Sequence, residues 1–260
     1  MAAEAKYDRI GVNYDTSRRA DPYILSRLLH HLAPINGKSY LDVACGSGNY
    51  TSAMASKAGN WSAIDQSDVM LSKARSKSAE VEWMKADAGN LPFTKGSFDG
   101  VTCTLAIHHF PSLRGAFGEI RRVLSDGRFV LFTSTTEQMK GYWLTEYFPV
   151  AMDRSWDQMP SRVEIEAALD VAGFKIEELE PYAVAEDLGD FFLYSGKHRP
   201  EMYLDPMVRR GISTFSSLAD PAEIEAGCRV LERDINSGRI KKVIAEYDND
   251  LGDYCFFVSS

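Results

Sequence analysis

Residues 39–49, SYLDVACGSGN, constrain the fold of this chain more than any other segment. The segment begins with apolar residues typical of a strand, turns at Gly46 and Gly48, and runs on into residues 50–58, which have helical character. Glycines let a backbone approach a ligand where a Cβ would clash, and a helix N-terminus presents unpaired N–H groups and a partial positive charge. Asp42 ends the strand with the opposite sign and suits an ammonium or hydroxyl group. The segment therefore predicts a ligand-binding strand–turn–helix unit.

The spacing of these glycines indicates a nucleoside site. It is close to the G-x-G-x-x-G fingerprint of dinucleotide-binding proteins, but Ala53 and Met54 stand where the last glycine would fall. Asp65 ends the next predicted strand, about 20 residues further on, where a carboxylate bonds a ribose diol. The pattern favours a site that holds a nucleoside without requiring a pyrophosphate.

Predicted strands and helices alternate along the first two thirds of the chain. The strands are expected at 39–43, 61–64, 81–85, 100–106, 129–133 and 174–181, with a last one in 253–260. The helices are expected at 23–32, 50–58, 66–76, 113–124 and 161–172, with two more near 207–217 and 221–237. This alternation predicts a mostly parallel sheet with right-handed crossovers, whose ligands bind beyond the carboxyl ends of the strands.

Two further phrases complete a family pattern. DVACGSGN, and DAGNLPF followed by SFDGV, are similar to the first, third and fourth motifs of class I S-adenosylmethionine-dependent methyltransferases. The resemblance is to the small-molecule branch that includes the ubiquinone and menaquinone C-methyltransferases, and it covers roughly residues 39–133. It implies a Rossmann-like α/β fold: a seven-stranded, mostly parallel sheet with helices on both faces. In this family the last strand runs antiparallel beside the fifth and sixth.

The resemblance also implies S-adenosyl-L-methionine as the cofactor and a set of contacts to it. The amino and carboxylate groups would lie near Arg18, Asp42 and Gly46. The ribose would meet Asp65, and the adenine would meet Asp87 and Ala88. The implied cofactor-binding residues are Tyr14, Arg18, Asp42, Ala44, Gly46, Gly48, Asp65, Gln66, Met70, Asp87, Ala88, Thr104 and Leu105.

Three residues are candidates for catalysis. His108 and His109 follow the fourth predicted strand, and histidine is the side chain that exchanges protons near neutral pH. Either ring could contact the acceptor or serve as a base, or could simply pack or cap the next helix. Tyr14 lies in a Y-D-x-x-R stretch, ending at Arg18, that resembles the segment with which many small-molecule methyltransferases cover the cofactor. The alternative for that stretch is a solvated leader.

Composition limits the partners and the environment that we expect. The chain has a net charge of -8, which argues against a nucleic-acid surface, and no apolar run long enough to cross a membrane. Its four cysteines show no C-x-x-C spacing, and no third ligand stands near the tandem histidines, so no metal site is expected. A reduced, cytoplasmic protein that acts on a small molecule as a monomer or homodimer is the simplest interpretation.

We expect one methyltransferase domain over residues 1–260. Residues 1–38 would form an N-terminal cover and helix, 39–184 the core, 185–251 a helical, aromatic insertion, and 252–260 the last core strand. The insertion, the leader and the aromatic-rich stretch 135–160 would cap the cofactor edge and give the acceptor an apolar pocket. The alternative for the insertion is an oligomer interface. The cluster Lys197, His198 and Arg199 could bind an acidic acceptor or could be a solvated turn.

Two other functions stay open at this point. One is an NAD(P)-dependent oxidoreductase on a Rossmann-type sheet, which the missing glycine and the lack of a Tyr-x-x-x-Lys set weaken. The other is a non-catalytic module that binds S-adenosylmethionine. The acceptor, and whether carbon, nitrogen, oxygen or sulfur is methylated, do not follow from the residues.

Overall fold

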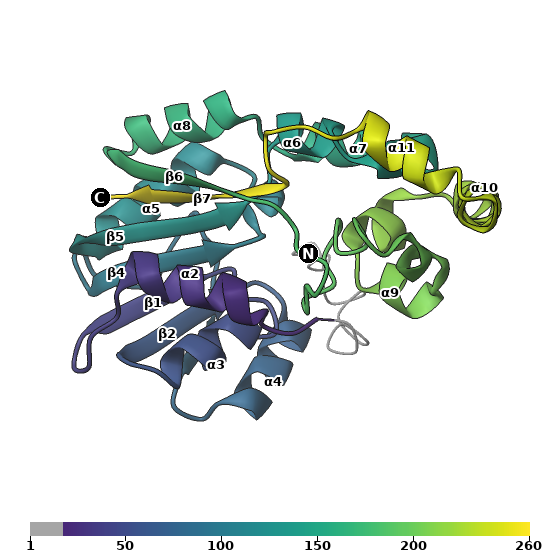
Figure 1. The fold of residues 1–260 in the computed structure, drawn as a ribbon. Coiled ribbons are helices and arrows are strands. Elements are labelled where there is room, and N and C mark those ends of the chain that lie inside the picture. The colour runs from purple at the N-terminus through teal and green to yellow at the C-terminus, as the bar shows by residue number, and fades with distance from the viewer. Residues whose placement is uncertain (1–17) are drawn as a thin grey trace.

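Seven strands form one sheet in the order β3-β2-β1-β4-β5-β7-β6 (Figure 1). The computed structural model describes residues 18–260, so the predictions for Tyr14 and the rest of the leader up to residue 17 lie outside the described residues. The strands are β1 (Ser39–Val43), β2 (Asn60–Asp65), β3 (Glu82–Lys85), β4 (Phe98–Thr104), β5 (Leu124–Thr133), β6 (Ile176–Tyr182) and β7 (Tyr254–Ser259).

Strands β1 to β5 pair in parallel, and β7 lies antiparallel between β5 and β6. Parallel neighbours need crossover connections, which the helices between them supply. All six residues of β7 are buried, because strands flank it on both sides and helices cover the sheet. The predicted fold class, including the antiparallel last strand, is confirmed.

Helices cover both faces of the sheet (Figure 1). One face carries α2 (Pro22–Leu32), α3 (Asn49–Ala55) and α4 (Asp68–Lys77); the other carries α5 (Leu113–Val123) and α8 (Arg162–Val171). Side-chain caps set several of their starts: Asp21, Ser67, Ser112 and Ser161 each accept a hydrogen bond from a first-turn backbone N–H. The sequence carries these start signals in full.

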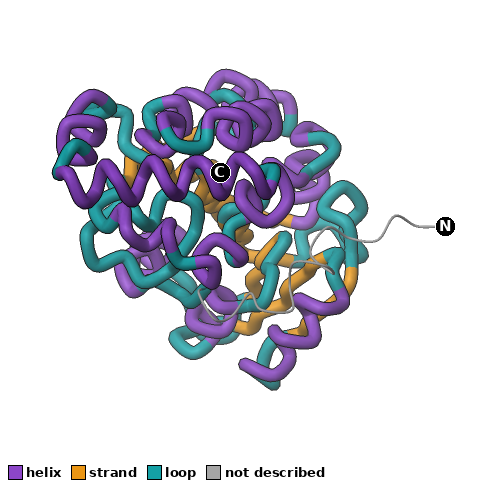
Figure 2. The backbone as a smooth tube through the Cα atoms, turned by 90° about the vertical axis from the view of Figure 1, so that its right-hand side faces the viewer, coloured by secondary structure: helices purple, strands orange, loops and turns teal. Residues whose placement is uncertain are grey.

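The other α-helices among residues 18–260 lie beyond the carboxyl ends of the parallel strands, and Figure 2 looks onto that edge. They are α6 (Thr136–Lys140), α7 (Pro149–Gln158), α9 (Pro206–Arg210), α10 (Pro221–Ser237) and α11 (Ile240–Glu246). One hydrophobic cluster runs from the α2 face of the sheet into these helices, and a second fills the α5–α8 face. Among residues 18–260, every helix is too short or too polar to cross a lipid bilayer.

Two local predictions need correction. The helix expected near 207–217 is interrupted: α9 ends at Arg210, and a π-helical turn, Thr214–Leu218, follows Gly211. Most aromatic side chains of 135–160 and 190–194 pack against other rings in the core, and of them only Phe192 lines one of the two cavities described below. Tyr142 and Tyr194, for example, lie face to face with ring centroids 3.7 Å apart, and both are buried.

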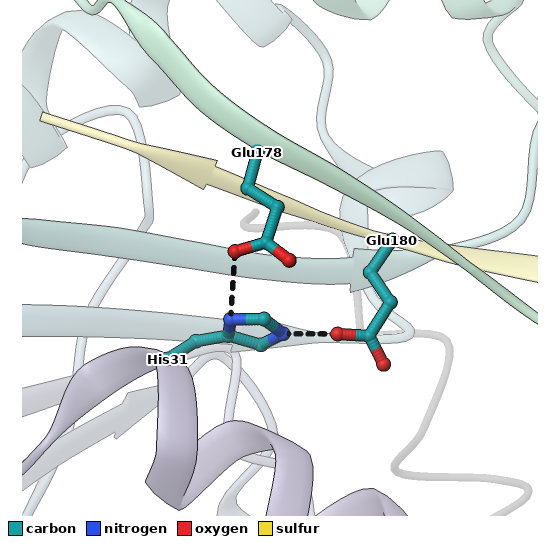
Figure 3. A group of neighbouring side chains, drawn as sticks. All are labelled: His31, Glu178 and Glu180. Carbon is teal, nitrogen blue, oxygen red and sulfur yellow. Dashed lines mark hydrogen bonds and ion pairs between the residues drawn. The ribbon is translucent and has the colours of Figure 1, made fainter.

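A buried histidine ties α2 to β6 (Figure 3). The Nε2 atom of His31 lies 2.7 Å from Glu180 and its Nδ1 atom 3.7 Å from Glu178, so the carboxylates contact opposite sides of one ring. The sequence could not anticipate this group, because its members lie about 150 residues apart in the chain. Arg27 also bonds both oxygens of Glu180, at 2.8 and 2.5 Å. One histidine and two carboxylates could in principle hold a metal ion, but the guanidinium of Arg27 would repel such a cation. We therefore assign this group a role in pairing the helix with the strand.

Candidate active site

A cavity of about 370 Å³ opens at the carboxyl ends of β1, β2 and β4. That volume lies within the range of small-molecule and cofactor sites. Ten of the predicted cofactor residues line it: Arg18, Asp42, Ala44, Gly46, Asp65, Gln66, Met70, Ala88, Thr104 and Leu105. The remaining lining residues are Cys45, Ser47, Asn49, Tyr50, Ile64, Ser67, Ala86, Ala106, His109, Phe110 and Asp190.

Asp65 is fixed at the end of β2 by two backbone groups. Its Oδ2 accepts from the N–H of Gly46 at 2.9 Å, and its Oδ1 accepts from the N–H of Ser67 at 2.8 Å. These bonds hold the carboxylate against the glycine turn, where it lines the cavity. A carboxylate in this position is suited to accept hydrogen bonds from a ribose diol in the cavity.

The turn at the end of β1 brings backbone to the cavity wall. Ala44 and Gly46 both line the cavity with left-handed φ values of 58° and 54°. A Cβ placed on Gly46 would have no atom of residues 18–260 within 4 Å, apart from the glycine and its chain neighbours, so within the described part of the chain this glycine faces open space. For Ala44 the same backbone region carries a steric cost, which is typical of backbone held in place at a functional site.

Gly48 differs from Gly46, because it packs against neighbouring side chains and not against the space predicted for the cofactor. It does not line the cavity. A Cβ at Gly48 would lie 2.5 Å from the indole of Trp83 and 2.9 Å from Cβ of Ala74. This glycine is therefore required for close packing of the α3 start against β3 and α4, and its φ of 73° adds a second reason.

Asp42 is buried beneath the turn. Its Oδ2 accepts from the hydroxyl of Thr51 at 2.5 Å and its Oδ1 from Thr102 at 3.0 Å. Burial raises the pKa of this carboxyl to about 6, even though the two hydroxyls act in the opposite direction. A cationic group in the cavity would find here a carboxylate that gains from having its charge neutralised.

The predicted adenine end of the cavity is formed by small and apolar residues. Met70 is 1% exposed, and Ala88 lines the wall beside it. Asp87 lies outside the lining residues: its Oδ2 accepts from Nε2 of Gln66 at 2.7 Å and its Oδ1 from the N–H of Gly89 at 2.7 Å. Gln66 itself lines the cavity, so Asp87 orients a wall residue and is one step removed from the space.

The end of β4 places a hydroxyl group in the cavity wall that is available to a ligand. The hydroxyl oxygen of Thr104 is buried and has no hydrogen-bond partner among the described residues. Leu105 follows with a φ of 55°, which is unusual for a bulky residue, and its N–H is fixed by the carbonyl of Phe132 at 2.8 Å. An unsatisfied hydroxyl in a cavity wall is costly unless a ligand bonds it.

The two candidate histidines separate two cavities. Their rings are in contact, with centroids 3.9 Å apart, in a short 3₁₀ turn, Ile107–His109. His109 lines the cavity described above, whereas His108 lines a second, smaller one of about 80 Å³. The two cavities share Arg18 and Leu105 in their walls. The tandem pair therefore stands where two bound molecules would meet.

Sequence reasoning missed Asp190 and Tyr50. Arg18 pairs with Asp190 at 2.5 Å, and the hydroxyl of Tyr50 donates to the same carboxylate at 3.1 Å. Asp190 is 1% exposed, so this bridge brings the insertion to the cavity wall. The N–H of Gly189 adds a bond to Asp21 at 2.9 Å. No spacing rule links residues this far apart, although the DLGD phrase at 187–190 marked an acidic turn in an otherwise aromatic stretch.

The basic cluster at 197–199 is used inside the fold. Lys197 pairs with Asp253 at 2.8 Å, and the ring of His198 lies 2.8 Å from the carbonyl of Val184. Arg199 donates to the carbonyl of Leu188 at 2.8 Å. The first and second of these bonds hold the insertion to the ends of β6 and β7. The hypothesis that the cluster binds an acidic acceptor is not supported by these contacts.

Fold and cavity together define the Rossmann-like methyltransferase class. Comparison with known proteins agrees: residues 41–132 match a family model described as a methyltransferase domain. Over 138 residues the chain is 34% identical to malonyl-[acyl-carrier protein] O-methyltransferase of Erwinia pyrifoliae, covering 53% of this chain and 52% of that one. It is 33% identical to demethylmenaquinone methyltransferase of Staphylococcus aureus, with coverages of 51% and 56%. The chain thus spans about half the length of these curated relatives.

A solved structure extends the likeness to nearly the whole chain. It is a putative methyltransferase from an antibiotic biosynthesis pathway of Anabaena variabilis, 31% identical, with a TM-score of 0.84. The alignment covers 94% of this chain and 99% of that one. The chain belongs to the methyltransferase family represented by this domain.

Proposed function

We propose that this protein is an S-adenosylmethionine-dependent methyltransferase that moves a methyl group to a small-molecule acceptor by in-line displacement. The observation that carries the proposal is the cavity at the strand ends, with Asp65 fixed against the glycine turn and Asp42 buried beneath it. When bound, S-adenosylmethionine supplies an electrophilic methyl group on a sulfonium centre. Everything else in the reaction falls to binding, orientation and exclusion of water.

The residues of the cavity fit such a cofactor. The open space at Gly46 lets the ligand approach the backbone, and the buried, unsatisfied hydroxyl of Thr104 offers a polar contact. Asp65 would bind the ribose diol, and Asp42 would face the cofactor's ammonium group. Met70 and Ala88 form an apolar wall for the base. Tyr14 remains a proposed contact in the leader.

We also propose roles for the tandem histidines. His108 lines the smaller cavity, so its ring would contact the acceptor and could take up the proton that a methylated oxygen or nitrogen releases. His109 lines the cofactor cavity and would position the ring of His108 by contact. Methylation of a C–H carbon or of a thiol also releases a proton, so the same ring could serve those acceptors.

The names of the two curated relatives give acceptors of different kinds, a malonyl group on a carrier protein and a quinone precursor. We carry over only the transfer of a methyl group. The cytoplasmic location stays a proposal, supported by four free cysteines. The absence of a nucleic-acid partner is supported by the net charge of -8, and monomer and homodimer both stay open. The assignment of all 260 residues to one domain is supported by the hydrophobic cluster that joins sheet and cap.

Calorimetric titration tests the cofactor directly. S-adenosylhomocysteine should bind with one site per chain, and NADH under the same conditions should not. Tight binding of NADH without binding of S-adenosylhomocysteine would favour the oxidoreductase. Binding of S-adenosylhomocysteine with no methyl transfer to any acceptor tried, including the protein's own co-purified small molecules, would favour the non-catalytic module.

A further inference from the structure

The smaller cavity has a wall of hydroxyl groups whose chemistry points to a class of acceptor. This inference rests on the proposed function, because the cavity is adjacent to the cofactor site and shares Arg18 and Leu105 with it. Six residues with hydroxyl groups line it: Thr133 at the end of β5, Ser134 after it, Ser155 on α7, Ser213 and Thr214 at the start of the π-helical turn, and Tyr254 on β7. Thr133, Ser134, Ser155 and Thr214, which have hydrogen bonds within the wall, are at least 95% buried.

Two of these hydroxyls have their protons committed to carbonyl groups at the end of the sheet. Thr133 Oγ1 lies 3.1 Å from the carbonyl oxygen of Ser134, and Ser134 Oγ lies 2.9 Å from that of Asp253. A carbonyl oxygen only accepts, so in both bonds the hydroxyl is the donor. Each hydroxyl oxygen keeps lone pairs.

The protons of the other two hydroxyls, on α7 and in the π-helical turn, are also committed to hydrogen bonds within the protein. Ser155 Oγ donates to the carbonyl of Ala151 at 2.9 Å and lies 2.9 Å from Thr214 Oγ1. Since the proton of Ser155 is directed to Ala151, the proton of Thr214 is the one shared between the two hydroxyls. The four groups therefore present acceptor lone pairs and no proton to whatever enters.

The remaining polar groups of the cavity, which include the hydroxyls of Ser213 and Tyr254, can also donate, so an anchoring group that both donates and accepts suits this wall. Arg18 is paired with Asp190 at 2.5 Å, and Nε2 of Gln158 donates to the carbonyl of Arg154 at 3.3 Å. His108 adds its ring beside Leu105. The rest of the wall is mainly apolar, with Met139, Met159, Phe192, Leu193 and Leu218.

The size of the cavity limits what enters it. Its volume of about 80 Å³ is roughly half that of the ~150 Å³ apolar cavity that holds benzene in a protein interior. A compact group fits, and the body of the molecule then extends toward Leu105 and the cofactor cavity. A long prenyl chain or a carrier-bound acyl group does not fit in this space without movement of α7 or the 211–218 turn.

We propose that the acceptor is a compact, neutral molecule anchored by a hydrogen-bond donor, a hydroxyl or an amine, that the hydroxyls of Thr133, Ser134, Ser155 and Thr214 bind. The anchoring group is distinct from the atom that receives the methyl group, since the hydroxyl wall lies on the far side of the shared boundary from the cofactor cavity. Neutrality follows from the shared wall, where the pairing of Arg18 with Asp190 balances the positive charge.

A matched pair of probes tests the anchor. Phenol and fluorobenzene have the same number of heavy atoms, but only phenol donates a hydrogen bond. Both are titrated by ligand-observed NMR against the protein saturated with S-adenosylhomocysteine. Phenol should bind at least about tenfold more tightly, since a buried acceptor left unbonded is costly. Thr133→Val and Ser155→Ala should reduce that preference, and Thr145→Val, which alters a buried hydroxyl outside the cavity, should keep it.

Equal affinity for the two probes, or failure of phenol to bind the saturated protein, would overturn the proposed anchor. Loss of the preference in Thr145→Val as well would also overturn it, since the effect would then not come from the cavity. Failure of S-adenosylhomocysteine to bind would instead contradict the proposed function. The two failures are thus distinguished in one set of samples.

Discussion

Asp42 and Asp65 end neighbouring strands, yet their surroundings are opposite. Asp65 accepts two backbone N–H bonds at the cavity wall, whereas Asp42 is buried under the turn and, among residues 18–260, accepts from two hydroxyls. One carboxylate is therefore ready to bind a neutral diol, and the other gains most from a cation. The first three predictions separate these residues and the tandem histidines from one another.

Asp65→Asn should weaken binding of S-adenosylhomocysteine by about 10- to 100-fold, because the ribose diol loses a charged acceptor. Asparagine keeps the shape of the side chain but has a single acceptor oxygen, so one of the two backbone N–H bonds, from Gly46 or Ser67, is lost as well. Asp68→Asn is the matched control, because Asp68 is exposed and pairs with Lys85 away from the cavity. Calorimetry would find the ribose assignment wrong if both variants bind as the parent does.

Asp42→Asn should make the protein more stable at pH 7.5. The pKa of Asp42 is about 6 in the folded protein, against about 3.9 in an unfolded chain, so the folded state holds this proton more tightly. Its contribution to the free energy of unfolding therefore falls as pH rises from about 4 to 6, by up to about 3 kcal/mol, and stays low above that. Urea unfolding of the asparagine variant should show a flatter dependence over this window.

Asp99→Asn serves as a control of opposite sign. The N–H of Ser39 and the ammonium of Lys38 lower the pKa of Asp99, so its charge stabilises the folded state at neutral pH. That variant should lose stability at pH 7.5. An Asp42→Asn protein that is less stable than the parent at pH 7.5 would contradict the assigned burial effect.

His108→Asn should lower kcat far more than it changes cofactor affinity, and the pH–rate profile should lose its acidic limb. His109→Asn should have a smaller effect on kcat and a larger one on KM for the cofactor, because that ring lines the cofactor cavity. If neither substitution slows turnover with an identified acceptor, both histidines are structural.

The glycine turn shows what a single element requires of its residues. Gly46 faces the cavity and Gly48 faces Trp83, although they stand two residues apart and look equivalent in the motif. A short turn between a strand and a helix must leave room for the ligand on one side. On the other side it must pack closely against the neighbouring helix and strand. The two requirements are separable by experiment.

Gly48→Ala should destabilise the protein by several kcal/mol, on the order of an overpacked core, because its Cβ meets the indole of Trp83 at 2.5 Å. Gly46→Ala should cost only about 1 kcal/mol of backbone strain but should weaken cofactor binding. Thermal unfolding and calorimetry measure the two effects. Equal losses of stability would show that the packing argument fails.

Elements with local signals were predictable from the sequence. The N-caps and the apolar stripe of α2 placed that helix nearly to the residue, and Asp65 was identified from its distance to the glycines. Contacts between distant segments were not predictable. The Arg18–Asp190 bridge, the His31 group and the separate roles of Gly46 and Gly48 depend on which elements pack together, and no periodicity reports that.

Across the whole molecule, the cap is attached to the cofactor edge at a few points. Arg18 and Asp190 join the leader to the insertion at the cavity wall, and the second cavity lies between α7, the 211–218 turn and the end of β5. Helices α10 and α11 line neither cavity. The part of the insertion 185–251 that covers the cofactor edge, which we call the lid, is therefore shorter than the full segment and excludes α10 and α11.

Hydrogen exchange should report this shorter lid. Addition of S-adenosylhomocysteine should protect residues 18–21 and 186–193 together with the strand ends that line the cavity, since these segments share bonds there. Helix α5, on the opposite face of the sheet, is the internal control. Protection confined to the core, with nothing gained at 186–193, would instead favour an insertion that serves as an oligomer interface.

The central claim is that the larger cavity holds the cofactor with its reactive end toward the smaller one. A crystal structure of the complex with S-adenosylhomocysteine tests it most directly. We expect the ribose at Asp65, the base between Met70 and Ala88, and the sulfur beside Leu105, at the wall that the two cavities share. Density for the ligand elsewhere, or with its sulfur directed away from Leu105, would contradict the account.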